Sequence, residues 1–130
     1  MKGIMPEEME VWYILPAIRR ECAKIMVQRG LSQREIAKKL FITEAAVSHY
    51  IKGKRGDIEF PESIQKEINQ SVTQLLQNGT IIQEFENLCR KIRASGFLCI
   101  IHKKYGITPK ECEKGEIICL NENGNATVCH

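Results

Sequence analysis

Thiol and imidazole groups, which bind metal ions and iron–sulfur clusters, concentrate toward the end of the chain. Five of the six cysteines fall in the last 42 residues: Cys89, Cys99, Cys112, Cys119 and Cys129. His102 follows Cys99 by three residues. No two of these cysteines form the short knuckle that supplies two ligands to a structural zinc site. Iron–sulfur clusters accept thiolates at wider and less regular spacing, so the set favours a cluster.

These cysteines are expected to hold an iron–sulfur cluster, with [4Fe–4S] favoured and zinc as the alternative. The expected ligands are Cys89, Cys99, Cys112 and Cys119, with Cys129 or His102 as a substitute ligand. Cys129 is placed second because it stands beside a terminus, where chains are poorly ordered. Two other interpretations stay open: Cys89 and Cys119 could be small core residues, or the cysteines could form disulfides, as in thermophiles.

Positive charge concentrates in the other half of the chain. The whole sequence has a net charge of +3, but residues 1–56 carry eleven basic and six acidic residues, whereas residues 57–130 carry eight and ten. A polyanion would therefore bind the first half.

Residues 31–53 within this basic half predict two short helices joined by a turn. Ser32 and Glu35 form a capping box that opens a helix over 33–40. Thr43 can cap a second helix over 44–52, which Gly53 ends. The second helix would bury Val47, Tyr50 and Ile51 and leave a polar face exposed. A short exposed helix with cationic flanks is typical of a helix-turn-helix in the DNA major groove.

The motif S-Q-x-E-I-A at 32–37, followed by V-S-x-Y-x-x-G at 47–53, resembles the phage-repressor or Xre-like helix-turn-helix family. The whole chain is similar to a group of uncharacterised archaeal regulators. The resemblance places recognition positions on Glu44, Ala45, Ser48 and His49, and places Gln33 beside the DNA backbone. Phe41 departs from the pattern, because the family usually has a turn glycine there. A non-glycine residue must adopt a left-handed conformation or change the turn.

Together the motif and its flanks predict a set of residues that contact DNA. They are Gln33, Arg34, Thr43, Glu44, Ala45, Ser48, His49, Lys52, Lys54 and Arg55. Ser48 and His49 could read base edges or be merely solvated, and Glu44 could accept a cytosine amino group or exclude wrong sequences. Lysines are better suited to phosphates than to base edges, so Lys38 and Lys39 are also predicted to contact phosphates. The alternative is a helical pair used for protein contacts.

The remaining pattern predicts a mainly all-α fold: an N-terminal helix-turn-helix bundle, a helical dimerisation region and a small cysteine-rich C-terminal module. Further helices are predicted at 16–29, 61–78, 81–95 and 97–105, and a loose hairpin at 117–120 and 126–129. The predicted domains are 1–59, 60–96 and 97–130. The apolar stripes of 61–78 and 81–95 could form a homodimer interface or be consumed in the monomer core.

Composition limits the function. At 130 residues the chain has room for one domain or a small domain with an appendage. No stretch is long and apolar enough to span a membrane or act as a signal peptide, so a cytoplasmic location is expected. The motifs of common catalytic sites are absent, so neither an enzyme nor a small-molecule substrate is expected.

The favoured hypothesis is a dimeric regulator that binds double-stranded DNA, with a cysteine module that senses redox state, iron or oxygen. The alternatives are a DNA-binding protein with structural zinc, or a disulfide-bearing module for RNA or protein.

Overall fold

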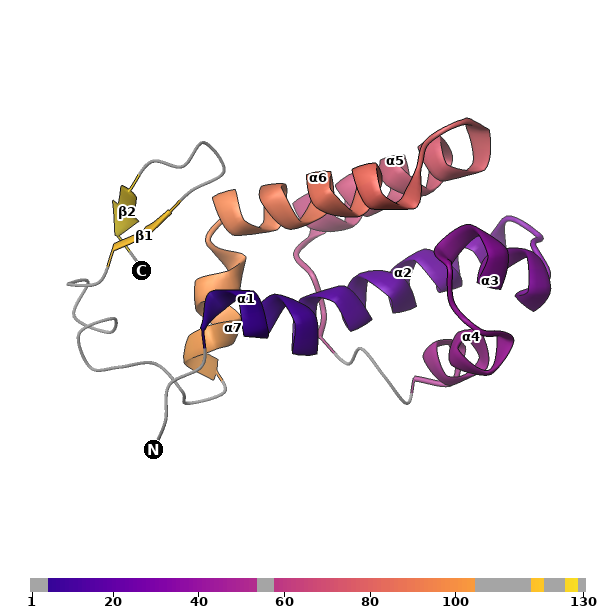
Figure 1. Ribbon diagram of the computed structural model, residues 1–130, viewed down its shortest axis with the longest axis horizontal. Helices are drawn as coiled ribbons and strands as arrows, with labels where there is room; N and C mark the ends of the chain where they lie inside the picture. Colours follow the sequence, from indigo (N-terminus) through magenta and orange to yellow (C-terminus); the bar gives the residue numbers. More distant parts are fainter. Residues whose placement is uncertain (1–4, 54–57, 105–117, 121–125, 129–130) are drawn as a thin grey trace.

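The computed structural model describes residues 5–53, 58–104, 118–120 and 126–128, and its elements are mainly helical (Figure 1). In chain order they are α1 (Pro6–Met9), the π-helical turn η1 (Glu10–Ile14), α2 (Leu15–Gln28), α3 (Gln33–Leu40), α4 (Glu44–Ile51), α5 (Glu62–Gln77), α6 (Ile81–Ala94), α7 (Phe97–Lys104), β1 (Ile118–Leu120) and β2 (Ala126–Val128). The two strands pair antiparallel, with Ile118 opposite Val128. The mainly all-α fold is confirmed, and so is the small hairpin.

One long rod runs from Pro6 to Gln28, formed by α1, η1 and α2 in succession (Figure 1). The predicted helix at 16–29 is confirmed as α2, with Pro16 in its first turn, but the sequence did not predict α1 and η1, which directly precede it. Pro16 has no N–H to donate, and the π-helical turn directly before it absorbs that break in the hydrogen-bond ladder. Burial of Met9 and Ile14, both without exposed surface, favours extension of the rod.

The rod is the centre around which the other helices pack. α5 and α6 form an antiparallel hairpin on one side of α2, and α3 and α4 lie at its far end (Figure 1). The core is one cluster that joins fully buried residues of α2, α3, α4, α5 and α6, among them Ile18, Ile36, Val47, Ile68 and Leu88. Because a single core runs through all these helices, α4 is held rigidly relative to the rest of the chain.

Polar contacts attach distant segments to the rod. The Arg20 guanidinium donates to the carbonyl oxygen of Ile58 at 2.7 Å and pairs with the Glu21 carboxylate at 2.9 Å. At the other end, Arg93 of α6 pairs with Glu10 of η1 at 2.8 Å. Among the helices that the structure describes, none is long and apolar enough to cross a membrane.

The apolar stripes predicted as possible dimer material are largely consumed inside the chain. On α5, Ile64, Ile68, Val72 and Leu75 are all buried, and on α6 so are Phe85, Leu88 and Ile92. Of the two alternatives, the packing therefore favours the monomer core. Ile82 is the exception on α6, because three quarters of its surface is exposed.

The turn between α3 and α4 passes through Phe41, which adopts the left-handed conformation with φ 55° and ψ 44°. The N–H of Ile42 donates to the carbonyl oxygen of Ala37 at 3.1 Å and closes the end of α3. The turn therefore keeps the geometry that glycine would give. Its phenylalanine bears the strain of a left-handed residue and leaves its side chain 82% exposed.

Phe41→Gly is expected to raise the free energy of unfolding by about 1 kcal/mol, because glycine adopts this conformation without a Cβ penalty. Little buried apolar surface would be lost, since the side chain is exposed. Thermal unfolding followed by circular dichroism should show a midpoint about 4 °C higher. A lower midpoint would mean that the Phe41 ring stabilises the turn by more than its strain costs.

Candidate nucleic-acid interface

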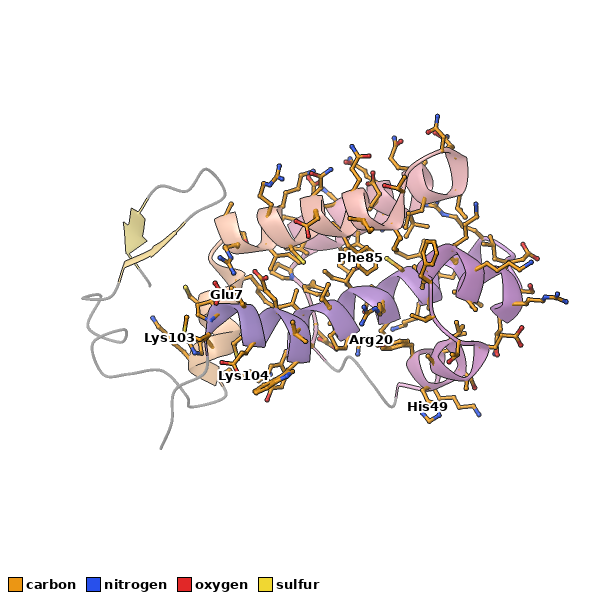
Figure 2. All side chains as sticks on the ribbon, viewed as in Figure 1. Glu7, Arg20, His49, Phe85, Lys103 and Lys104 are labelled. Atoms are coloured by element: carbon orange, nitrogen blue, oxygen red, sulfur yellow. The ribbon has the colours of Figure 1, made fainter. Side chains whose placement is uncertain are left out.

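α4 presents a polar face to solvent because its apolar face is fixed to α2 and α3. Val47 and Tyr50 are buried against these helices. The predicted contact residues on the other side are accessible: Thr43, Glu44, Ala45, His49 and Lys52 are exposed, and Ser48 is half-buried. Figure 2 shows the His49 side chain pointing away from the body of the molecule. This face has the size and polarity of a helix that enters the major groove.

Local caps fix where α3 and α4 begin, as the sequence predicts. The Ser32 hydroxyl accepts the N–H of Glu35 at 3.2 Å. The Thr43 hydroxyl accepts the N–H of Ala46 at 3.0 Å. Gln33 and Arg34 are exposed in the first turn of α3. Side chains and N–H groups at such helix starts are suited to hold DNA phosphates, which sets the register of a neighbouring helix.

Positive charge around this face comes from several elements. Arg34 lies on α3 and Lys52 ends α4, and both are exposed. The predicted phosphate contacts Lys54 and Arg55 lie outside the described residues. Lys38 and Lys39, also predicted as phosphate contacts, line a groove with Phe41 and Ile82. No local pattern in the sequence predicts that groove; its one signal is Phe41, which stands where the family usually has a turn glycine.

The structure describes the predicted metal ligands only in part. Cys112 and Cys129 lie outside the described residues, and Cys119 lies in β1, of which only the backbone is described. Cys89 and Cys99 are half-buried, on α6 and α7. Within the described ranges, no three side chains of metal-binding type converge on a point. Cys89, Cys99 and His102 therefore do not form a three-ligand site by themselves.

His102 differs from the other candidate ligands in its surroundings. It is 8% exposed on the buried side of α7, one turn after Cys99. Its Nε2 atom is buried and has no hydrogen-bond partner among the residues placed by the structure. A buried, unsatisfied imidazole nitrogen is costly, and coordination of a metal is one way to satisfy it.

Cys22 and Cys89 lie in surroundings that oppose ionisation. Burial, with a smaller contribution from the Glu21 carboxylate, raises the pKa of the Cys22 thiol to about 12. Burial also raises the pKa of Cys89 to about 12, helped by Glu10 and Glu86. Cys22 is thus a buried residue of the core. The surroundings of Cys89 in the metal-free chain disfavour the thiolate, which is the form that a metal binds.

Alkaline conditions are expected to destabilise the fold through these thiols. Unfolded thiols lose their protons near the ordinary pKa of 9.0, whereas Cys22 and Cys89 keep theirs to about 12. The stability that these two protonated thiols contribute is fully present below about pH 9 and is lost as the pH rises toward 12. For fully buried Cys22 the loss approaches about 1.4 kcal/mol per pH unit. Urea unfolding between about pH 8 and 10 should show a smaller decline for Cys22→Ala, and an equal decline would contradict the assignment.

Comparison with known proteins agrees with this geometry. Residues 23–56, from the second half of α2 through α4, match the helix-turn-helix family. No curated protein and no solved structure matches the chain. The match supports a helix-turn-helix of Xre type and indicates a DNA-binding regulator.

Proposed function

We propose that this chain, with its Xre-type helix-turn-helix, is a sequence-specific transcriptional regulator that inserts α4 into the major groove of double-stranded DNA. The observation that carries the proposal is the split of α4 between a face fixed to α2 and α3 and an exposed polar face. The packed face makes the orientation of the helix rigid, so its polar side chains meet DNA in one register.

The exposed side chains divide between two tasks. Ala45, Ser48 and His49 lie on the face that meets base edges, and the Glu44 carboxylate can accept a hydrogen bond from a cytosine amino group. Gln33, Arg34 and Thr43 are exposed, and we propose that they contact the DNA backbone beside the major groove. Lys52, with Lys54 and Arg55 after it in the sequence, supplies charge for phosphates.

Selection from a pool of random DNA duplexes tests this proposal. We expect one sequence to be enriched and to bind at least about 1,000-fold more tightly than random duplex. The affinity should fall linearly with salt concentration on logarithmic axes. Lys54→Ala/Arg55→Ala should weaken binding to all sequences and reduce that slope by about two. Failure to enrich any sequence would contradict sequence-specific binding.

We also propose that the regulator binds DNA as a homodimer. A helix of eight residues reads few base pairs, and paired half-sites about 34 Å apart are the usual way to gain affinity. Because the stripes of α5 and α6 are mostly buried, their residues are not the proposed interface. Two protomers per duplex in sedimentation experiments, and a palindromic selected sequence, are the expected results. One protomer on an asymmetric site would contradict the dimer.

For the cysteine-rich end we propose a metal centre, with an iron–sulfur cluster as the favoured cofactor and zinc as the alternative. The support is the spacing of Cys99 and His102 on one helical turn, together with the buried Nε2 of His102, which has no partner in the part of the chain that the structure describes. The raised pKa of Cys89 makes His102 a better fourth ligand beside Cys99, Cys112 and Cys119. A bound cluster would supply a redox- or iron-sensitive state to the regulator.

Anaerobic purification, with an absorbance spectrum and assays of iron, sulfide and zinc, tests the metal centre. We expect equal amounts of iron and sulfide and a broad visible absorbance band. The variants Cys99→Ala and His102→Ala should lose the iron and sulfide together with the band. Loss in Cys89→Ala with retention in His102→Ala would reverse the choice of fourth ligand. One zinc ion per chain, with a metal content that does not change in air, would favour a structural zinc site instead. A metal-free protein whose mass increases on reduction would favour disulfides.

A further inference from the structure

A groove of about 380 Å³ lies where the end of α3 meets the turn between α5 and α6. Its lining is Lys38, Lys39, Phe41, Leu75, Gly79, Thr80, Ile81 and Ile82. Buried Leu75 belongs to the core, while Phe41 and Ile82 stand on the outside, 82% and 75% exposed. They are the two most exposed large apolar side chains in the described part of the chain. Apolar groups gathered in this way mark interaction sites.

The strained backbone and exposed ring of Phe41 indicate that the groove binds another molecule. The free protein bears the cost of its left-handed backbone and gains almost no burial from its ring in return. Glycine at this position would remove the strain and keep the turn. A residue that disfavours the isolated fold in this way is expected where the side chain has another partner. An exposed aromatic ring is also a frequent anchor in protein interfaces.

The electrostatics of the groove fit a carboxylate. Lys38 and Lys39 are exposed on its rim, and neither forms an ion pair with any residue in the ranges described. Thr80 begins the 14-residue helix α6 at the opposite rim, so the positive end of that helix dipole adds to the two lysines. Among the residues that the structure places around the groove, none is acidic. An occupant must therefore combine apolar side chains with negative charge.

The DNA itself does not match this requirement. No residue of α4 lines the groove, and in Figure 1 α3 lies between α4 and the α5–α6 turn. A phosphate backbone offers charge but nothing to cover Phe41 and Ile82. The groove can thus be filled while α4 is in the major groove.

A second copy of the chain matches poorly as well. A symmetric contact through this groove would bring Lys38 and Lys39 of both copies together, which costs energy. A second exposed aromatic residue, Trp12, lies on η1. Figure 2 places Glu7 at that end of the rod together with Lys103 and Lys104, so the surface there has mixed charge. A different polypeptide is the better fit.

We propose that this groove docks an acidic amphipathic segment of a partner protein. Apolar side chains of the segment lie between Phe41 and Ile82 over Leu75, and its carboxylates pair with Lys38 and Lys39. Binding of this kind follows the helix-in-groove mode, in which apolar anchors supply affinity and flanking charges supply orientation. The proposal is independent of the DNA sequence that α4 reads, and it would let the regulator bind DNA and a partner at once.

Selection of peptides from a random twelve-residue library against the full immobilised chain tests the proposal. We expect enriched peptides in which aspartate or glutamate alternates with large apolar residues. Their affinity, measured by fluorescence anisotropy, should fall at least about tenfold for Lys38→Glu/Lys39→Glu. The matched control Lys24→Glu/Lys66→Glu changes two exposed lysines away from the groove and should bind within about twofold of the original chain.

Phe41→Gly gives the decisive comparison, because it is expected to stabilise the fold and yet weaken peptide binding about tenfold. Misfolding could not explain that combination. Absence of acidic peptides from the enriched set, or equal binding by the Phe41→Gly chain, would overturn the proposal. Displacement of the peptide by duplex DNA would show that the groove belongs to the DNA interface. Self-association abolished by Lys38→Glu/Lys39→Glu would instead identify a second copy as the occupant.

Discussion

Ala45→Glu is expected to lower the affinity for the selected DNA duplex by at least about 100-fold. Ala45 is exposed at the second position of α4, on the face that is proposed to enter the major groove. A glutamate there adds a side chain where base edges must approach and a negative charge beside phosphates. The measurement is a titration of labelled duplex at fixed salt concentration, with circular dichroism as the check on folding.

Ser63→Glu is the matched control for this variant. Ser63 is exposed at the second position of α5, so the substitution adds the same charge at the same place in a helix. A carboxylate in the first turn is favourable to both helices through the helix dipole, so neither variant should unfold the chain. Equal loss of affinity in both variants would mean that net charge matters and the position on α4 does not. Unchanged affinity in Ala45→Glu would exclude α4 as the reading helix.

The helix-turn-helix could be predicted from the sequence because its signals are local. Ser32 and Thr43 cap the helices that they were expected to cap, and the buried positions Val47 and Tyr50 follow from helical spacing. Caps act within one turn and the apolar period acts within one helix, so neither depends on the rest of the fold. The position of the polar face followed from the same local pattern.

Contacts between distant segments could not be read in this way. Pro16 is a good first residue for a helix, but burial of Met9 and Ile14 extends the rod through it. The groove joins residues near 40 with residues near 80, which are brought together by the packing of α5 on α2 and of α6 on α5. Phe41 was visible as a departure from the family pattern, but its neighbours were not.

The surroundings of each thiol are a further feature that could not be predicted from the sequence. The sequence predicts both Cys89 and Cys99 as ligands, because both fit an irregular spacing, and it leaves open that Cys89 is a core residue. The structure separates them by environment. Burial, helped by the carboxylates of Glu10 and Glu86, raises the pKa of Cys89. His102 lies one turn after Cys99, and its buried Nε2 atom has no hydrogen-bond partner within the described ranges. Environment of this kind depends on tertiary packing, so a count of cysteines cannot supply it.

Arg20→Ala is expected to lower the free energy of unfolding by about 3 kcal/mol, the largest effect on stability that we predict for a polar residue. The side chains of Arg20 and Glu21 are both only 12% exposed. Removal of the guanidinium leaves the Glu21 carboxylate buried without its ion-pair partner, and leaves the Ile58 carbonyl oxygen without its donor. Urea unfolding should show the loss, and thermal unfolding a midpoint about 10 °C lower.

Lys91→Ala provides the comparison, because it removes an ion pair to Glu67 in which the side chains are 51% and 34% exposed. That loss should be below about 1 kcal/mol, since water and salt screen an exposed pair. The double variant Arg20→Met/Glu21→Met should recover most of the stability lost in Arg20→Ala, because it removes both buried charges together. Arg20 Nε also has no partner among the residues described, so the buried pair is incompletely satisfied. If the double variant stayed as unstable as Arg20→Ala, the hydrogen bond to the Ile58 carbonyl oxygen would be the contact that matters.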